Sequence, residues 1–160
     1  MYFENEQDKE YNNWWKNFDM EKTGYLFENC SDYIHDKFGV YLNIPVFLNF
    51  YLNYDLRNNI DNHHPKLSTI SMGEILDLLI KVDLNNEIPD YMKSNYNNMN
   101  NYKRNELYWI GWFFIYCLYT NDDVKDSRDL NKILNFETLN KLYTTFHEMD
   151  LRNCYERVFG

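Results

Sequence analysis

The chain of 160 residues carries a formal net charge of −9 at neutral pH, and 44% of its residues are hydrophobic. An ordinary hydrophobic fraction at this length predicts one folded domain, because two domains would each be left with a small core. The negative charge argues against direct binding to nucleic acid or to an anionic membrane surface, since both depend on clustered Lys and Arg.

The charge and the aromatic residues are unevenly placed. Residues 1–36 contain nine acidic and three basic side chains, a net charge of −6, whereas the remainder is close to balanced. The first third is also rich in Trp and Tyr. Such residues are favoured anchors at protein interfaces, and carboxylates steer association with basic partners. The alternative is that residues 1–36 form ordinary amphipathic helices whose polar faces happen to be acidic.

The three cysteines, Cys30, Cys117 and Cys154, form no CxxC pair. Their odd number, and the apolar surroundings of Cys117, predict reduced and buried thiols. The first ten residues, MYFENEQDKE, are acidic and contain no apolar stretch, so no signal peptide is expected. We therefore expect a cytoplasmic protein.

Two helices are predicted in the first forty residues. Aromatic residues spaced by three and four positions mark one helical face within residues 11–22, and Thr23-Gly24 is expected to end that helix. The same periodicity continues over residues 26–38. Gly39 fits the position just after a helix end, where glycine adopts a left-handed conformation at little cost.

The middle of the chain predicts two further helices. Pro45 suits the first turn of a helix over residues 45–60, because a proline there loses no helical hydrogen bond. Ser71 and Glu74 match the S-x-x-E capping box, which predicts a helix over residues 72–82. Pro89 opens another helical candidate that becomes irregular over the Asn-rich residues 95–101.

The stretch LYWIGWFFIYCLY, residues 107–119, contains no charged or amide side chain. It is shorter than the roughly 20 apolar residues that a membrane-spanning helix needs. Its apolar side chains would cover the whole circumference of a helix, which is typical of a central, buried helix over residues 105–120. A buried strand is the alternative. Asn105 is the expected N-cap, and Gly111 is expected to let another element approach closely.

Short amphipathic helices are predicted over residues 127–158, with Ser127, Asn135 and Asp150 as N-caps and His147 closing a helix C-terminus. The sequence therefore predicts an all-α, single-domain bundle of about six to eight helices over residues 1–160. Its parts would be an acidic aromatic N-terminal part (1–40), a core helix (105–120) and C-terminal helices (127–158).

Few residues offer catalytic chemistry. Asp61, His63 and His64 include natural Zn²⁺ ligands, but no further ligands follow at a recognisable spacing. His147 precedes Cys154, yet Glu148, Asp150 and Glu156 nearby would raise the thiol pKa. No P-loop, GxGxxG, GxSxG, HExxH or EF-hand pattern occurs. We expect no cofactor and no enzymatic activity.

Two segments near the C-terminus, YWIGWFFIYCLYT and ILNFETLNKLYTTFHEMD, resemble a group of small bacterial antitoxin-like accessory proteins encoded near toxins and mobile elements. The chain departs from that group at residues 114–117, where a basic and aromatic segment is expected. The resemblance implies a small bacterial or phage interaction protein and supplies no catalytic residue. The positions that carry it are Tyr108, Trp109, Ile110, Gly111, Thr120, Tyr143, Phe146, His147 and Asp150.

The leading hypothesis is a non-enzymatic inhibitor, antitoxin-like or anti-CRISPR-like, that masks the basic surface of a nucleic-acid-binding protein partner. Its carboxylates would lie where phosphates normally bind. The expected partner-binding residues are Glu10, Trp14, Trp15, Asp19, Glu28, Asp32 and Asp36. Two alternatives stay open. One is a small metal-dependent hydrolase or nuclease using Asp61, His63 and His64. The other is a self-assembling subunit of a phage or mobile element.

Overall fold

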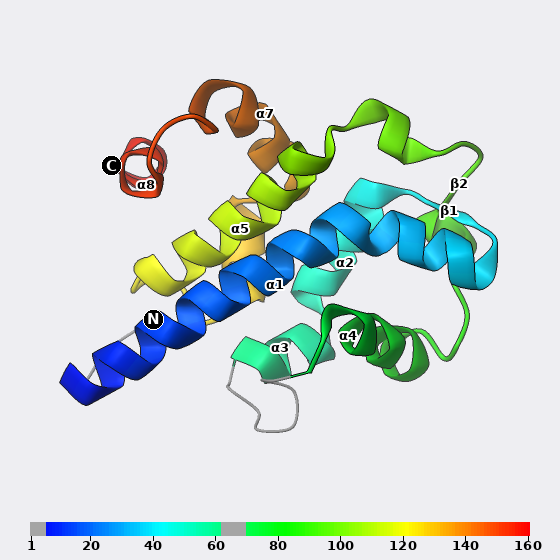
Figure 1. Cartoon of the computed structure of the whole chain (residues 1–160), viewed down its shortest axis with the longest axis horizontal. Helices are drawn as coiled ribbons and strands as arrows, with labels where there is room; N and C mark the ends of the chain where they lie inside the picture. The colour runs from blue at the N-terminus through cyan, green and yellow to red at the C-terminus, as the bar shows by residue number, and fades with distance from the viewer. Residues whose placement is uncertain (1–5, 62–69) are drawn as a thin grey trace.

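Helices form nearly all of the regular structure in the computed structural model, which describes residues 6–61 and 70–160 (Figure 1). Two short strands, β1 (Tyr41–Leu42) and β2 (Lys93–Ser94), pair antiparallel. The predicted all-α fold is confirmed. None of the described helices is long and apolar enough to cross a membrane. The α-helices of the described residues are α1 (Glu6–Phe38), α2 (Ile44–Asn53), α3 (Asp55–Asp61), α4 (Met72–Leu78), α5 (Arg104–Thr120), α6 (Ser127–Ile133), α7 (Phe136–Phe146) and α8 (Leu151–Phe159).

The predicted helix end at Thr23-Gly24 is wrong, because α1 runs unbroken through both residues. Glycine here serves close packing rather than a turn. A Cβ atom added at Gly24 would lie 2.7 Å from the Tyr108 ring, and one at Gly111 would lie 2.8 Å from the Thr23 carbonyl oxygen. The two glycines let α1 and α5 lie side by side (Figure 1). The expectation of a close approach at Gly111 is thereby confirmed.

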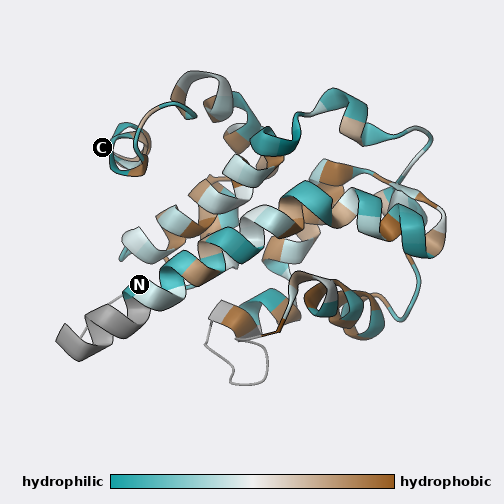
Figure 2. Ribbon diagram, viewed as in Figure 1, coloured by the Kyte–Doolittle hydropathy of each residue, from teal (hydrophilic) through white to brown (hydrophobic). Residues whose placement is uncertain are grey.

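Helix α5 is central and buried on nearly all sides, which confirms the helix and excludes the strand alternative for residues 107–119. Its N-cap is Lys103 rather than the expected Asn105, which lies inside the first turn. The backbone N–H of Lys103 donates to Glu106 Oε2 at 3.3 Å. Figure 2 shows many hydrophilic residues along α1. The buried apolar residues of α1, α2 and α5 belong to one core cluster.

The segment 44–60 forms two helices instead of the one predicted. Asn43 is the N-cap of α2, its side chain accepting a hydrogen bond from the Val46 backbone N–H, and Pro45 lies in the first turn as predicted. The chain becomes extended at Tyr54 and then turns into α3. The break changes the direction of the chain and places Arg57 on a separate helix.

The other predicted termini agree in most cases with the structure. Gly39 has a φ of +67° just beyond α1, and the Ser71 side chain caps α4, which continues as a π-helical turn over Leu79–Asp83. Residues 89–101 contain two 3₁₀ turns, Asp90–Met92 and Asn98–Asn101, beside β2. The helix predicted to open at Pro89 is therefore wrong, because only one short 3₁₀ turn forms before the chain enters β2, whereas the irregularity predicted over residues 95–101 is confirmed.

The C-terminal caps were also predicted, with one correction. Asn135 and Asp150 cap α7 and α8, and His147 ends α7 with Nδ1 2.7 Å from the Tyr143 carbonyl oxygen. The N-cap of α6 is Asp126, because its carboxylate accepts a hydrogen bond from the Asp129 N–H. Ser127 is instead a buried residue in the first turn, and its hydroxyl faces Arg57.

Candidate functional site

Because α1 is one continuous helix, its 3.6-residue period separates residues 14–36 into a buried and an outward face. Asn13, Asn17, His35 and Lys37 of α1 are exposed. Six further outward residues recur at spacings of seven, four, three, four and four positions, and of these six four are acidic and two are aromatic. We call this set the acidic stripe, and it consists of Trp14, Glu21, Tyr25, Glu28, Asp32 and Asp36.

The two aromatic side chains of the acidic stripe are exposed: Trp14 is 56% exposed and Tyr25 is 53% exposed. Trp14 stacks on Phe18 with ring centroids 5.5 Å apart and ring planes nearly parallel. Glu21 and Asp36 are exposed, whereas Glu28 is half-buried. The stripe therefore offers exposed aromatic area between carboxylates, and Trp and Tyr are favoured anchors at protein interfaces.

Two basic residues border the acidic stripe. Arg104, at the start of α5, forms an ion pair with Asp32 at 2.5 Å, and about half of each side chain is exposed. Lys22 extends away toward α4, where its ammonium donates to the Ile70 carbonyl oxygen at 2.9 Å. Partial burial lowers the pKa of Lys22, and the charge of Asp19 opposes that shift. Arg104 thus neutralises one of the four carboxylates.

One hollow borders the acidic stripe, and a second lies between α5 and α7. A groove of about 410 Å³ runs between α1 and the start of α4, and Phe18, Ile70 and Met72 form its apolar part. A smaller hollow of about 200 Å³ lies between α5 and α7. We call it the aromatic pocket, and its lining residues are Asn105, Tyr108, Trp109, Trp112, Tyr143 and His147.

The structure corrects two of the predicted partner-binding residues. Trp15 and Asp19 are each only 1% exposed, because they lie on the face of α1 that packs into the core. Neither side chain can meet a partner. Trp14, Glu28, Asp32 and Asp36 do lie on the outward face. The side chain of Glu10 lies outside the described part of the chain.

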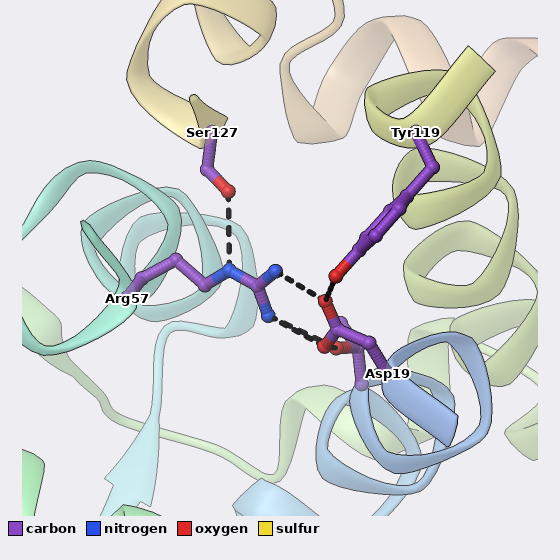
Figure 3. A network of polar contacts seen from close by, with 5 residues as sticks. Asp19, Arg57, Tyr119 and Ser127 are labelled. Carbon is purple, nitrogen blue, oxygen red and sulfur yellow. Dashed lines mark hydrogen bonds and ion pairs between the residues drawn. The ribbon is translucent and has the colours of Figure 1, made fainter. Parts of the chain in front are cut away.

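Asp19 forms a buried ion pair with Arg57 of α3 (Figure 3). The guanidinium donates Nη1–H to Asp19 Oδ1 at 2.9 Å and Nη2–H to Oδ2 at 2.6 Å. Its Nε–H donates to Ser127 Oγ at 3.1 Å, and the Tyr119 hydroxyl donates to Asp19 Oδ2 at 3.3 Å. Thr23 also donates to Asp19. This network ties four helices together.

The electrostatics of the pair favour the charged form of Asp19. Burial alone would raise the pKa of its carboxyl group, but the charge and hydrogen bonds of Arg57 outweigh burial and hold the pKa below its ordinary value. Both side chains are almost completely enclosed. The pair is therefore a structural contact, and it offers no surface to a substrate or partner.

The proposed metal ligands cannot be compared with the structure, since His63, His64 and the Asp61 side chain lie outside the described residues. Within residues 6–61 and 70–160, no group of three or more His, Cys, Asp or Glu side chains could hold a metal ion. His147 stacks on Tyr143 with ring centroids 4.3 Å apart. Its place at the end of α7 is that of a helix-closing residue, as predicted.

The three cysteines are free and buried, as predicted. The thiol of Cys154 donates to the Phe146 carbonyl oxygen at 3.1 Å. Burial raises its pKa, and the nearby charge of Asp150 raises it further. These surroundings oppose formation of a nucleophilic thiolate at Cys154.

Sequence reasoning missed Glu21 and Tyr25 as members of the outward face. The signal was present, because both fall on the same helical period as Trp14 and Asp32. Because the sequence-based prediction ended the helix at Gly24, residues on either side of Gly24 were not placed on one helical face. Comparisons with protein-family models, with curated proteins and with solved structures found no match, so the resemblance to antitoxin-like accessory proteins stays an expectation.

Proposed function

We propose that this protein is a non-enzymatic inhibitor that uses the acidic stripe to cover the basic, nucleic-acid-binding surface of a protein partner. The observation that carries the proposal is the alignment of four carboxylates and two exposed aromatic rings along one face of a single 33-residue helix. The antitoxin-like or anti-defence role expected from the sequence is one form of such inhibition.

The dimensions of the acidic stripe support the proposal. From Trp14 to Asp36 the helix rises about 33 Å, at 1.5 Å per residue. One turn of B-DNA covers about 34 Å. A groove that follows one turn of duplex could therefore accept the whole stripe, with carboxylates meeting the Lys and Arg side chains that otherwise contact phosphates. Trp14 and Tyr25 would supply the apolar contact area.

The net charge also supports this function. At −9 the chain repels nucleic acid and attracts basic proteins over long range, which raises association rates. The local imbalance is concentrated in residues 1–36, the part of the chain that includes most of α1. Charge-steered association would be strongest at low ionic strength, because screening increases with salt.

The test compares proteins captured from a host lysate by three versions of the chain. One is the wild type. The second reverses three stripe carboxylates through Glu21→Lys, Glu28→Lys and Asp36→Lys. The third is a matched control that reverses three exposed carboxylates elsewhere, Glu87→Lys, Asp90→Lys and Asp123→Lys. The two variants change the net charge equally, so only the position of the charge differs.

We expect a nucleic-acid-binding protein that the wild type and the control capture and the stripe variant does not. Added duplex DNA should compete for that partner, and its activity should fall when the wild-type chain is bound. Equal capture by the stripe variant and the control would refute the proposal. Recovery of the chain itself alone would favour the self-assembling alternative.

A further inference from the structure

The aromatic pocket is built from two helices that meet at their sides. Helix α5 contributes Asn105, Tyr108, Trp109 and Trp112, and the C-terminal end of α7 contributes Tyr143 and His147. Its volume of about 200 Å³ is below the range of roughly 300–1,000 Å³ that drug-sized ligands occupy. The space suits one side chain or a small organic ion.

The rings of the pocket are held by contacts with one another. Trp109 and Tyr143 meet edge to face with centroids 5.7 Å apart, and Tyr108 lies 6.4 Å from Trp112. Tyr108 also meets Tyr25 at 5.3 Å, edge to face. Through this contact the pocket borders the acidic stripe, so one partner could occupy both.

Carboxylates of α1, of α5 and of the turn after α7 lie near the rings of the pocket. Burial raises the pKa of Tyr143, and the charges of Glu106 and Glu148 raise it further. The pKa of Tyr108 is raised by burial and then by groups of α1, among them Glu21 and Glu28. Of the six lining residues, only His147 can carry a positive charge, and its ring lies against Tyr143.

We propose that the aromatic pocket binds the guanidinium group of an arginine side chain presented by the basic partner, an inference that rests on the proposed function. The faces of aromatic rings carry negative electrostatic potential and attract organic cations, Arg in particular. The neighbouring carboxylates strengthen that attraction and disfavour anions. Arginine is also among the commonest residues at the energetic centres of interfaces.

The test uses the full chain and two small probes, N-acetylarginine methylamide and N-acetylcitrulline methylamide. The probes have nearly the same shape, but only the first is charged. Binding is followed by NMR through the indole N–H signals of the four Trp residues. The arginine probe should shift the signals of Trp109 and Trp112 and leave that of Trp14 unchanged. The citrulline probe should bind about 3- to 30-fold more weakly, the loss expected for a cation–π contact.

A variant separates the pocket from general surface effects. Tyr143→Leu removes one aromatic wall and should weaken binding of the arginine probe at least about threefold. Tyr91→Leu, at a residue 62% exposed and far from the pocket in the chain, is the control and should bind as the wild type does. Thermal unfolding of both variants verifies that they are folded. If Tyr143→Leu does not fold, Trp112→Leu removes an aromatic wall at a half-buried residue, and the Trp109 indole signal then reports binding.

Equal affinity for the two probes, or no shift at Trp109 and Trp112, would overturn the assignment of a cation site. Failure of the pocket is distinguishable from failure of the proposed function. If the stripe variant loses the partner but Tyr143→Leu still captures it, only the proposal of an arginine site in the pocket is refuted. If the arginine probe binds the pocket but reversal of the stripe charges leaves partner capture unchanged, only the proposed function is refuted.

Discussion

Asp19 and Arg57 meet through two parallel hydrogen bonds of 2.9 and 2.6 Å, 38 residues apart in sequence and almost fully buried. The pair fixes α3 against α1, and Ser127 and Tyr119 add α6 and α5 to the same point. A buried ion pair contributes to stability only while both partners are present, since a lone buried charge is strongly unfavourable.

Replacing Arg57 by Met should therefore lower the free energy of unfolding by about 3–5 kcal/mol, because Asp19 is left as an unpaired buried charge. The double variant Asp19→Leu/Arg57→Met removes both charges and should recover most of that loss. Urea unfolding followed by circular dichroism measures both effects. A double variant no more stable than Arg57→Met would show that the pair does not act as a coupled unit.

The same pair predicts how stability depends on pH. The pKa of Asp19 is lower in the folded chain than the value of about 3.9 that it has when unfolded. The unfolded state then binds more protons below about pH 4, so the free energy of unfolding falls as the pH falls through this window. The contribution is complete at neutral pH. Unfolding measured between about pH 5 and pH 3 should show a steeper loss for the wild type than for Asp19→Leu/Arg57→Met, and parallel curves would contradict this prediction.

Three glycine-to-alanine changes should have different effects. Gly111→Ala should cost about 1–3 kcal/mol, because its Cβ would meet the Thr23 backbone carbonyl, which cannot move without shifting α1. Gly24→Ala should cost less, since it meets the Tyr108 ring. Gly73→Ala, where the nearest atom is 3.7 Å away, should stabilise α4 by about 0.5–1 kcal/mol. Urea unfolding of the three variants gives the order, and a stabilising Gly111→Ala would show that α1 and α5 are further apart.

The cysteines should be protected from thiol reagents in the folded chain. Burial raises the pKa of Cys30 to about 12 and also raises that of Cys117, so few thiolates form at neutral pH. Reaction with a disulfide reagent at pH 7.5 should be at least about 1,000-fold slower than for free cysteine, because access requires opening of the core. All three thiols should react in denaturant. Rapid reaction of one thiol in the folded chain would locate an accessible site.

Arg104→Gln tests the charge of the acidic stripe without altering α1. Losing this ion pair frees Asp32 and should change the free energy of unfolding by no more than about 1 kcal/mol, because both partners are half-exposed. Association with the captured partner should become about two- to threefold faster at low salt. The gain should vanish near 1 M salt, where the screening length is about 3 Å. An unchanged rate at both salt concentrations would argue against steering by the stripe.

Local sequence signals determined much of the helical framework. Asn135 and Asp150 cap helices because their side chains reach backbone N–H groups two or three residues ahead, and Gly39 ends α1 because of its positive φ. The apolar circumference of residues 107–119 likewise predicted a buried helix. These features depend only on neighbours in the chain, so the sequence alone is sufficient.

The tertiary structure decided what the local pattern left ambiguous. Gly24 is compatible with a helix end or with a close helix contact, and only the presence of Tyr108 against it selects the second. Asp19 and Asp32 are both acids on α1, but they point in different directions from the helix. Asp19 faces α3 and is a buried partner of Arg57, whereas Asp32 is a half-exposed member of the acidic stripe. Which carboxylates face a partner depends on contacts between residues distant in sequence. Composition and spacing do not encode those contacts, because they arise only when the helices pack.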